Sequence, residues 1–237
     1  MKHLQLDDLQ EGDRLALTPP WRHLRYAVLE AGAVFAPPVA EPCEEGYLLL
    51  EGRLAAGLGG TVGPAALLRR GVGARVTHGG GGPARLLYMG VDAVAASTGG
   101  DDWLIEAVDL DRLTWRAAIH GGAGRMATRH IWGPDDFNST WTFYDHAVLA
   151  AHSSVGYHYH DALEECFIVL AGQGYMTIDD ETFAVGPGSV TFQGIGQGHG
   201  MYNPYPQDLN FVRLAVAQPD QTYTTIDLHD DLAARRP

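Results

Sequence analysis

Lysine, cysteine and long apolar runs are scarce in this sequence of 237 residues, and each scarcity excludes a class of function. The single lysine, Lys2, lies at the N-terminus, so Schiff-base chemistry on an internal lysine and pyridoxal-phosphate catalysis are excluded. The two cysteines, Cys43 and Cys166, are too few for a disulfide framework. No apolar run reaches the ~18 residues of a membrane helix, and the acidic N-terminus lacks a signal-peptide core. We therefore expect a cytoplasmic protein without a membrane partner.

Basic residues are also scarce, with 16 against 29 acidic ones and a net charge of −13. Binding to nucleic acid needs a basic stripe, which this sequence does not have, so we expect no nucleic-acid partner. Glycine and histidine are plentiful instead, with 30 and 11 copies. The glycine share is nearly double the usual value of about 7%, which indicates many tight turns.

Short apolar runs separated by glycine, proline, aspartate and asparagine recur along the chain, and long helical periodicity is nearly absent. This spacing is typical of an antiparallel β-sandwich or barrel. The sequence therefore predicts an all-β protein. The expected strands lie at Tyr47–Leu50, Arg85–Met89, Thr142–Leu149, Cys166–Leu170, Tyr175–Ile178, Ser189–Phe192 and Asn210–Val216.

An internal repeat indicates that one β domain occurs twice. Three landmarks recur in the same order, the first at an offset of 120 residues and the other two at 123. The matched segments are Glu44–Gly52 with Glu164–Gly172, Val62–Pro64 with Val185–Pro187, and Gly71–Gly73 with Gly194–Gly196. We predict two domains, residues 1–110 and 111–237.

Metal-ligating residue types gather in the second copy. His158 and His160 are two residues apart, so on a strand they face the same side. A short turn would carry the chain to Glu165 on the next strand, and a later strand would bring His199 to the same point. Three imidazoles and a carboxylate suit Fe(II), Mn(II), Ni(II), Cu(II) or Zn(II), because affinity alone does not select among these ions.

The stretch resembles the two sequence motifs of the cupin superfamily. His158, His160, Glu165 and Gly172 match the first motif, G-x5-H-x-H-x3,4-E-x6-G, although its leading glycine is displaced to Gly156. The second motif, G-x5-P-x-G-x2-H-x3-N, is matched by Gly188, Gly196, His199 and Asn203, with Gly194 in place of the proline. The resemblance implies two tandem cupin-like barrels of the jelly-roll or double-stranded β-helix type. It also implies that His158, His160, Glu165 and His199 are metal ligands and that the protein is a homodimer.

The first copy lacks the ligand set. Alignment with the second copy places Pro38 and Ala40 at the positions of His158 and His160, and Val76 at the position of His199. Glu45 survives alone, and His78 lies near the missing ligand without partners. We predict a degenerate first domain and one divalent transition metal per chain, with Fe(II) favoured over Mn, Ni, Cu or Zn.

Three further residues are pocket candidates in the second domain. His146 lies on the strand before the motif, although a structural role is favoured for it. Met201 shares strand parity with His199, which fits a pocket wall and core packing equally well. Arg213 lies inside an apolar strand, where it either anchors a substrate carboxylate or points outward along the wall. The outward position is favoured.

Four protein ligands leave open positions on an octahedral ion, and this favours catalysis on a small organic molecule. The leading prediction is a mononuclear oxygenase that resembles dioxygenases. One alternative is a non-redox isomerase, lyase or hydrolase acting on a small acid or sugar, with a separate side chain moving a proton. Another alternative is a cupin that binds a small ligand without turnover.

Overall fold

The computed structural model describes residues 2–9, 15–16, 20–36, 43–55, 58, 60–69, 75–92, 103–117 and 119–235. The chain forms two compact units. The first barrel comprises Leu9–Asp109 and Pro134–Trp141; the second barrel comprises Met1–Asp8, Leu110–Gly133 and Thr142–Pro237. The all-β prediction is confirmed, because helical structure among the described residues is limited to short 3-10 turns. No helix in these ranges is long and apolar enough to cross a membrane.

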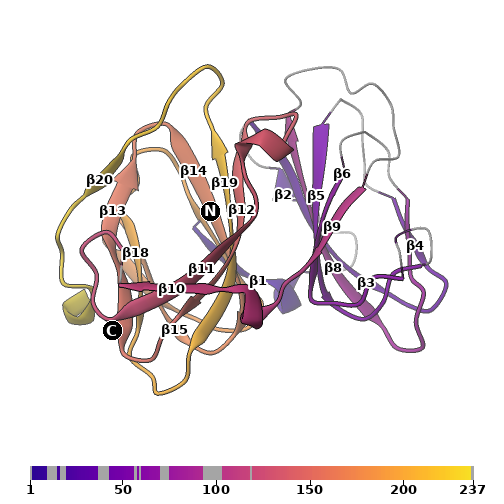
Figure 1. Cartoon of the computed structure of the whole chain (residues 1–237), viewed down its shortest axis with the longest axis horizontal. Helices are drawn as coiled ribbons and strands as arrows, with labels where there is room; N and C mark the ends of the chain where they lie inside the picture. The colour runs from indigo at the N-terminus through magenta and orange to yellow at the C-terminus, as the bar shows by residue number, and fades with distance from the viewer. Residues whose placement is uncertain are drawn as a thin grey trace. The chain divides into compact units, whose positions relative to one another are not determined.

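The second barrel is built from two antiparallel sheets (Figure 1). The seven-stranded sheet has the order β1 (His3–Gln5), β17 (Ser189–Gln193), β14 (Leu163–Ala171), β19 (Leu209–Ala217), β12 (Trp141–Leu149), β11 (Arg125–Trp132) and β10 (Thr114–Ala117). The five-stranded sheet has the order β16 (Glu181–Val185), β15 (Gly174–Ile178), β18 (His199–Asn203), β13 (Ser153–His160) and β20 (Thr225–Asp227). The 3-10 turns of this unit are η1 (Leu6–Asp8), η3 (Leu110–Arg112) and η5 (Leu232–Arg235).

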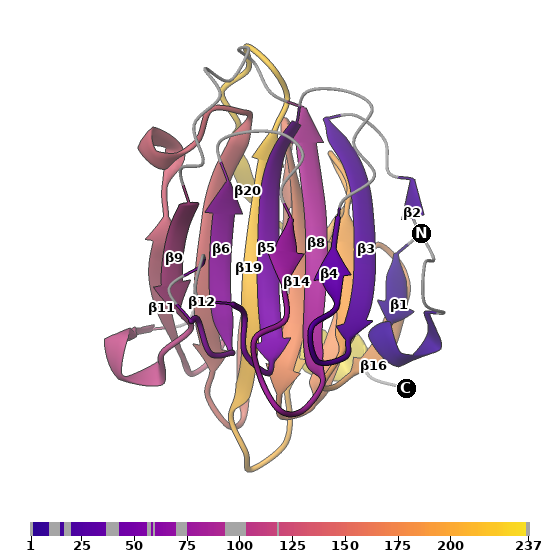
Figure 2. The same ribbon diagram turned by 90° about the vertical axis from the view of Figure 1, so that its right-hand side faces the viewer.

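The first barrel repeats this plan with fewer strands among its described residues. Its main sheet has the order β2 (Leu15–Ala16), β3 (Trp21–Leu29), β8 (Ala84–Asp92), β5 (Cys43–Glu51), β6 (Ala65–Arg69) and β9 (Trp103–Ala107). Figure 2 shows the four central strands of this sheet side by side. The second sheet consists of β4 (Val34–Phe35) and β7 (Val76–Thr77). The unit also contains the 3-10 turn η4 (Pro134–Asp136).

Two segments lie in a different unit from the one that the predicted ranges 1–110 and 111–237 give them. Strand β1 pairs antiparallel with β17, so the N-terminal residues belong to the second barrel. The segment Pro134–Trp141 belongs to the first barrel. It is held there by the buried Glu44, whose carboxylate accepts bonds from the Asn138 backbone N–H at 2.9 Å and the Ser139 hydroxyl at 2.6 Å. Hydrogen bonding therefore decides the membership of both segments more than chain order does.

The repeat has a direct structural counterpart. Strands β5 and β14 begin and end 120 residues apart, and so do β3 and β12. Phe35 corresponds to Val155 at the offset of 120 residues. Val76 pairs with Phe35 and Met201 pairs with Val155, so Val76 corresponds to Met201. The predicted equivalence of Val76 with His199 is therefore wrong. The loops before β7 and β18 therefore differ by two residues more than the sequence alignment allowed. The landmark Gly71–Gly73 lies outside the described residues.

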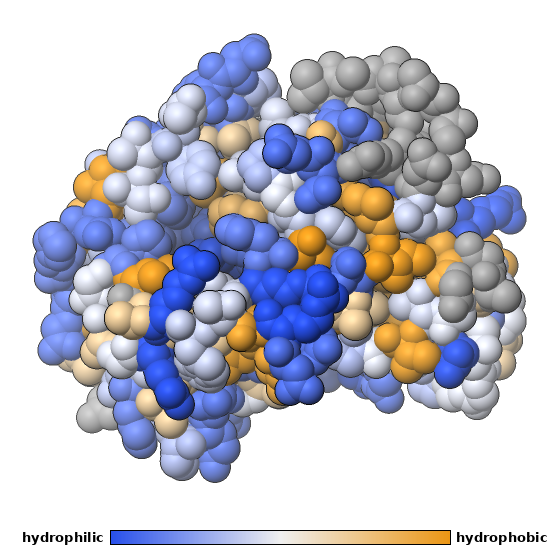
Figure 3. All heavy atoms as spheres, in the orientation of Figure 1, coloured by the Kyte–Doolittle hydropathy of each residue, from blue (hydrophilic) through white to orange (hydrophobic). Residues whose placement is uncertain are grey.

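Alternating residues of the strands fill the interior of the second barrel, as expected for facing antiparallel sheets. The main core cluster draws on both sheets, with side chains such as Phe167 and Phe211 from one and Met176 and Ile178 from the other. The face drawn in Figure 3 is largely hydrophilic over this barrel, with scattered apolar groups. The apolar interior fixes the strand register, because a one-residue slip would turn this whole set to the surface.

The turn after β14 depends on glycine. Gly172 has φ +83°, and a Cβ built on it would collide with the carbonyl oxygen of Asp208. We expect Gly172→Ala to lower the free energy of unfolding by about 1–3 kcal/mol from backbone strain alone. Gly133→Ala is the matched control, since a Cβ there meets nothing within 4 Å. Urea denaturation would compare the two variants, and equal stabilities would contradict the prediction.

Candidate metal centre

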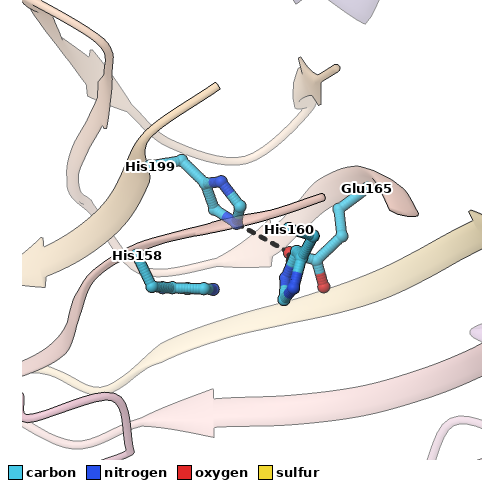
Figure 4. Close-up of side chains that lie close together, drawn as sticks. All are labelled: His158, His160, Glu165 and His199. Atoms are coloured by element: carbon cyan, nitrogen blue, oxygen red, sulfur yellow. Dashed lines mark hydrogen bonds and ion pairs between the residues drawn. The ribbon is translucent and has the colours of Figure 1, made fainter. Parts of the chain in front are cut away.

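The structure brings all four predicted ligands together inside the second barrel. His158 and His160 come from β13, Glu165 from β14 and His199 from β18. One possible ligand atom from each lies within 4.8 Å of the others, and all four residues are buried. Figure 4 shows the rings and the carboxylate directed toward one another. Pairing of His158 with His199 across β13 and β18 sets the imidazoles side by side.

Each imidazole is oriented by a bond at its Nδ1 atom. His158 Nδ1 lies 2.8 Å from the Gly156 carbonyl oxygen, and His199 Nδ1 lies 3.0 Å from that of Gln197. His160 Nδ1 lies 3.0 Å from the Thr225 hydroxyl. Such bonds fix the tautomer and ring direction of metal-binding histidines. They leave the three Nε2 atoms facing the centre of the cluster, which is what a metal ion requires.

The Nε2 atom of His158 is buried and has no hydrogen-bond partner among the described residues. Burial lowers the pKa of His158 to about 2, and the neighbouring His199 adds to this effect. The ring is therefore neutral, with an unshared electron pair at Nε2. A buried polar atom without a partner is costly, and binding a metal ion would satisfy it. The residues present thus fit a divalent transition metal.

Glu165 supplies the negative charge of the cluster. Its Oε2 atom lies 2.7 Å from His199 Nε2 and 3.3 Å from His160 Nε2. Burial alone would raise the pKa of Glu165. The bonds from His160 and His199 and the charge of Arg213 instead hold it well below its usual range. A carboxylate that stays ionised without solvent contact is a strong ligand for a divalent ion.

In the first barrel, the residue that corresponds to Glu165 is Glu45, and its carboxylate already has protein partners. Glu45 is buried, accepts a hydrogen bond of 2.9 Å from the Tyr47 hydroxyl and lies 3.9 Å from the Arg69 guanidinium. Pro38 and Ala40 lie outside the described residues. His78 occupies the register position of Asn203, two positions beyond that of Met201, and so does not replace His199. Within the described residues, the four-residue cluster of the second barrel is the one group of possible ligands.

Arg213 lies beside the cluster, so the outward position favoured from the sequence is wrong. Its Nη1 atom is 3.7 Å from Glu165 Oε1, and its Nη2 donates to Asp145 Oδ2 at 2.7 Å. The guanidinium also lies over the Phe143 ring, 4.6 Å from its centroid. Two carboxylates hold the arginine on the inner face of β19. Asp145, on the neighbouring strand β12, was not anticipated from the sequence.

The other two pocket candidates have different surroundings. His146 follows Asp145 on β12 and so points to the opposite side of the sheet, where its Nε2 lies 2.8 Å from Asn210 Oδ1. It does not face the ligands, because alternation turns it away. Met201 points inward but is buried in the main core cluster. Neither residue belongs to the metal centre.

His120 adds a fourth imidazole that the sequence analysis missed. Its ring stacks on that of His158 at a centroid distance of 3.9 Å, and its Nδ1 lies 3.1 Å from Asp227 Oδ1. The residue has φ +56° in the turn between β10 and β11. That turn extends the sheet beside β13 through the bond from the Gly156 N–H to the Ile119 carbonyl. No local sequence pattern signals this contact.

His130 is an exposed residue that is hydrogen-bonded to the buried Asp145, the partner of Arg213. Its exposed ring donates from Nδ1 to Asp145 Oδ1 at 2.6 Å, and this bond raises the pKa of His130 above its ordinary value. The stabilisation is therefore complete below about pH 6.5 and is lost as the pH rises through the higher folded pKa. NMR titration should give His130 an elevated pKa that falls in Asp145→Asn. Equal values in both proteins would contradict the assignment.

Comparisons with known proteins agree with this geometry. The Cupin domain family matches residues 146–216, which include all four ligands. An oxalate-binding protein of Thermotoga maritima is 24% identical over 98 residues, or 41% of this chain and 81% of that protein. The oxalate decarboxylase of Lactobacillus farciminis, solved as a formate complex, has a similar fold with TM-score 0.61 and 12% identity, covering 96% of this chain and 88% of that one. For the Bacillus subtilis oxalate decarboxylase, studied for its Mn(II) centres, the TM-score is 0.57 and the identity 11%, covering 96% and 79%.

Fold and site together define a two-barrel protein with a metal centre in its second barrel. Residues 146–216 match the Cupin domain family, and the fold of the chain is similar to that of the oxalate decarboxylases. Among the described residues, its metal centre lies in the second domain alone.

Proposed function

We propose that the protein is a metal-dependent lyase that decarboxylates a small organic acid. The observation that carries the proposal is the convergence of three imidazole Nε2 atoms and one carboxylate beside a buried arginine. The similarity to proteins named for oxalate decarboxylation and oxalate binding supports an acid substrate and a lyase rather than the oxygenase predicted first. It also supports Mn(II) rather than Fe(II) as the ion.

A divalent ion in this site would supply Lewis-acid polarisation of a bound carboxylate or carbonyl oxygen. The side chains of the protein would orient the bound acid. Arg213 binds the acid through its free Nε–H, which is buried and has no hydrogen-bond partner among the described residues. Guanidinium groups pair well with carboxylates, so this donor orients the acid next to Glu165.

The chemistry requires cleavage of the bond between the carboxyl carbon and its neighbour. Carbon dioxide leaves, the electron pair stays on the neighbouring carbon, and a proton completes the product there. Burial of the four ligands keeps bulk water away from this point. Each acid consumed therefore gives one carbon dioxide, with no net use of oxygen.

The test begins with protein purified without added metal, analysed for its elements and then loaded with Mn(II). Release of carbon dioxide from oxalate and from 2-oxo acids would be followed together with oxygen uptake. We expect one metal per chain and carbon dioxide release without stoichiometric oxygen consumption. Oxygen uptake equal to turnover would refute the lyase and restore the oxygenase, and two metals per chain would refute the single site.

A second candidate function is binding without turnover. The observation that favours it is the similarity to a protein named for oxalate binding. In that case the acid would be recovered unchanged after hours with the Mn(II)-loaded protein, although calorimetry would show it bound.

A further inference from the structure

We propose that the acid accepted by this site has a single carboxylate and an apolar body, and so differs from oxalate. This inference rests on the proposed function of the metal centre. It starts from a small apolar cluster, which we call the apolar wall, at one side of the ligands. Its members are Phe143, Leu163 and Ala215, with the partly buried Ala217 and Tyr223 packed against them.

Strand register places the apolar wall directly beside the ligands. Ala215 on β19 is the cross-strand partner of Glu165, and Ala217 is the partner of Leu163. Leu163 precedes Glu165 by two residues, so both side chains lie on the inner face of β14. Directly opposed side chains in a sheet have Cβ atoms about 5 Å apart. The wall therefore borders the carboxylate ligand.

Two aromatic rings extend the wall to the other polar groups of the site. Tyr223 meets the His160 ring edge-on at a centroid distance of 5.8 Å. The Phe143 ring lies under the Arg213 guanidinium at 4.6 Å. An acid held by Arg213 next to Glu165 thus has apolar surface on its remaining side.

The wall is distinct from the main core of the barrel. The core cluster contains Phe167 and Phe211 and does not include the wall residues. Phe167 approaches His199 at a ring distance of 6.3 Å, so the ligands have apolar groups on both sides. Ala217 and Tyr223 of the wall are only partly buried, which puts the wall on the side of the ligands that is nearer to solvent.

The apolar wall also disfavours a dianion. The second carboxylate of oxalate would lie against the wall residues, and burying an unpaired charge beside apolar groups is costly.

The test compares oxalate with 2-oxoisovalerate on the full-length Mn(II)-loaded protein by titration calorimetry. Both acids present two adjacent oxygen atoms, one on each of two bonded carbons, but 2-oxoisovalerate carries an isopropyl group where oxalate carries the second oxygen of its second carboxylate. We expect 2-oxoisovalerate to bind at least roughly 10-fold more tightly, which is the lower end of the discrimination that an apolar pocket provides.

Variants of the wall make the assignment specific. Leu163→Ala and Tyr223→Ala should each reduce this preference several-fold while the metal content stays at one per chain. Tyr223 is partly exposed, so its variant should fold even if the other does not. Cys43→Ala is the matched control, because Cys43 holds the place of Leu163 in the first barrel and should leave both affinities unchanged.

Three outcomes would overturn the inference. If oxalate binds as tightly as 2-oxoisovalerate, or if both wall variants keep the wild-type ratio, the wall does not select the acid, and the proposed lyase stands. If neither acid binds to protein that carries its metal, the proposed function fails together with the inference.

Discussion

Glu165→Gln is expected to abolish tight metal binding and all activity that depends on it. Glutamine keeps the shape of the side chain but removes the charge that lies 2.7 Å from His199 Nε2 and 3.3 Å from His160 Nε2. Changes to residues that merely orient ligands cost about 10–100-fold in metal affinity or activity, so loss of a ligand charge should exceed about 100-fold. Competition with a chelator, followed by elemental analysis, measures the affinity directly.

The repeat supplies a matched control for this variant. Glu45 stands 120 residues earlier, on the strand that corresponds to β14, and is also buried. Its carboxylate already has Tyr47 and Arg69 as partners, so Glu45→Gln should leave metal content at one per chain. A similar loss of metal in both variants would show that stability, rather than ligation, is responsible.

Arg213→Met should cause the largest loss of stability, about 3–5 kcal/mol. The substitution keeps the apolar stem but removes the cation that lies between Asp145 and Glu165, whose side chains are each 1% exposed. Removing one partner of a buried ion pair leaves an uncompensated charge, which accounts for a loss of this size. Urea denaturation of the metal-free protein gives the free energy of unfolding.

Two comparisons separate charge from packing. Adding Asp145→Asn to Arg213→Met should recover part of the stability, because it removes one of the two buried carboxylate charges that Arg213→Met leaves without their arginine partner. Arg85→Met removes a surface partner of Glu51, both largely exposed, and should cost less than about 1 kcal/mol. A loss for Arg213→Met no larger than that for Arg85→Met would argue against the buried network.

Three of the four ligands could be predicted because they depend on local geometry. His158 and His160 need only strand alternation to share a face, and Glu165 lies just beyond the following turn. His199 lies 34 residues beyond Glu165 and was predicted from the resemblance to the second cupin motif. The two-barrel fold was predictable for a related reason. The repeat and the spacing of the apolar runs are patterns in the order of residues along the chain, so they can be recognised without knowing which distant segments come into contact.

The surroundings of the ligands could not be predicted, because they depend on contacts between distant segments. Asp145 and Arg213 are 68 residues apart in sequence but bonded in space. An arginine in an apolar strand has the same local sequence whether it points inward or outward, so only its partner settles the direction. His120 reaches His158 through a turn with positive φ, for which the sequence gives no signal.

Strand β1 has a consequence for the order in which the second barrel is assembled. Residues His3–Gln5 are synthesised before the first barrel, but their partners Ser189–Gln193 on β17 are synthesised after it. When the first barrel has been made, the segment that forms β1 therefore still has no strand to pair with, while domains that emerge early generally fold as units. The edge of the seven-stranded sheet thus joins a segment made before the first barrel to one made after it.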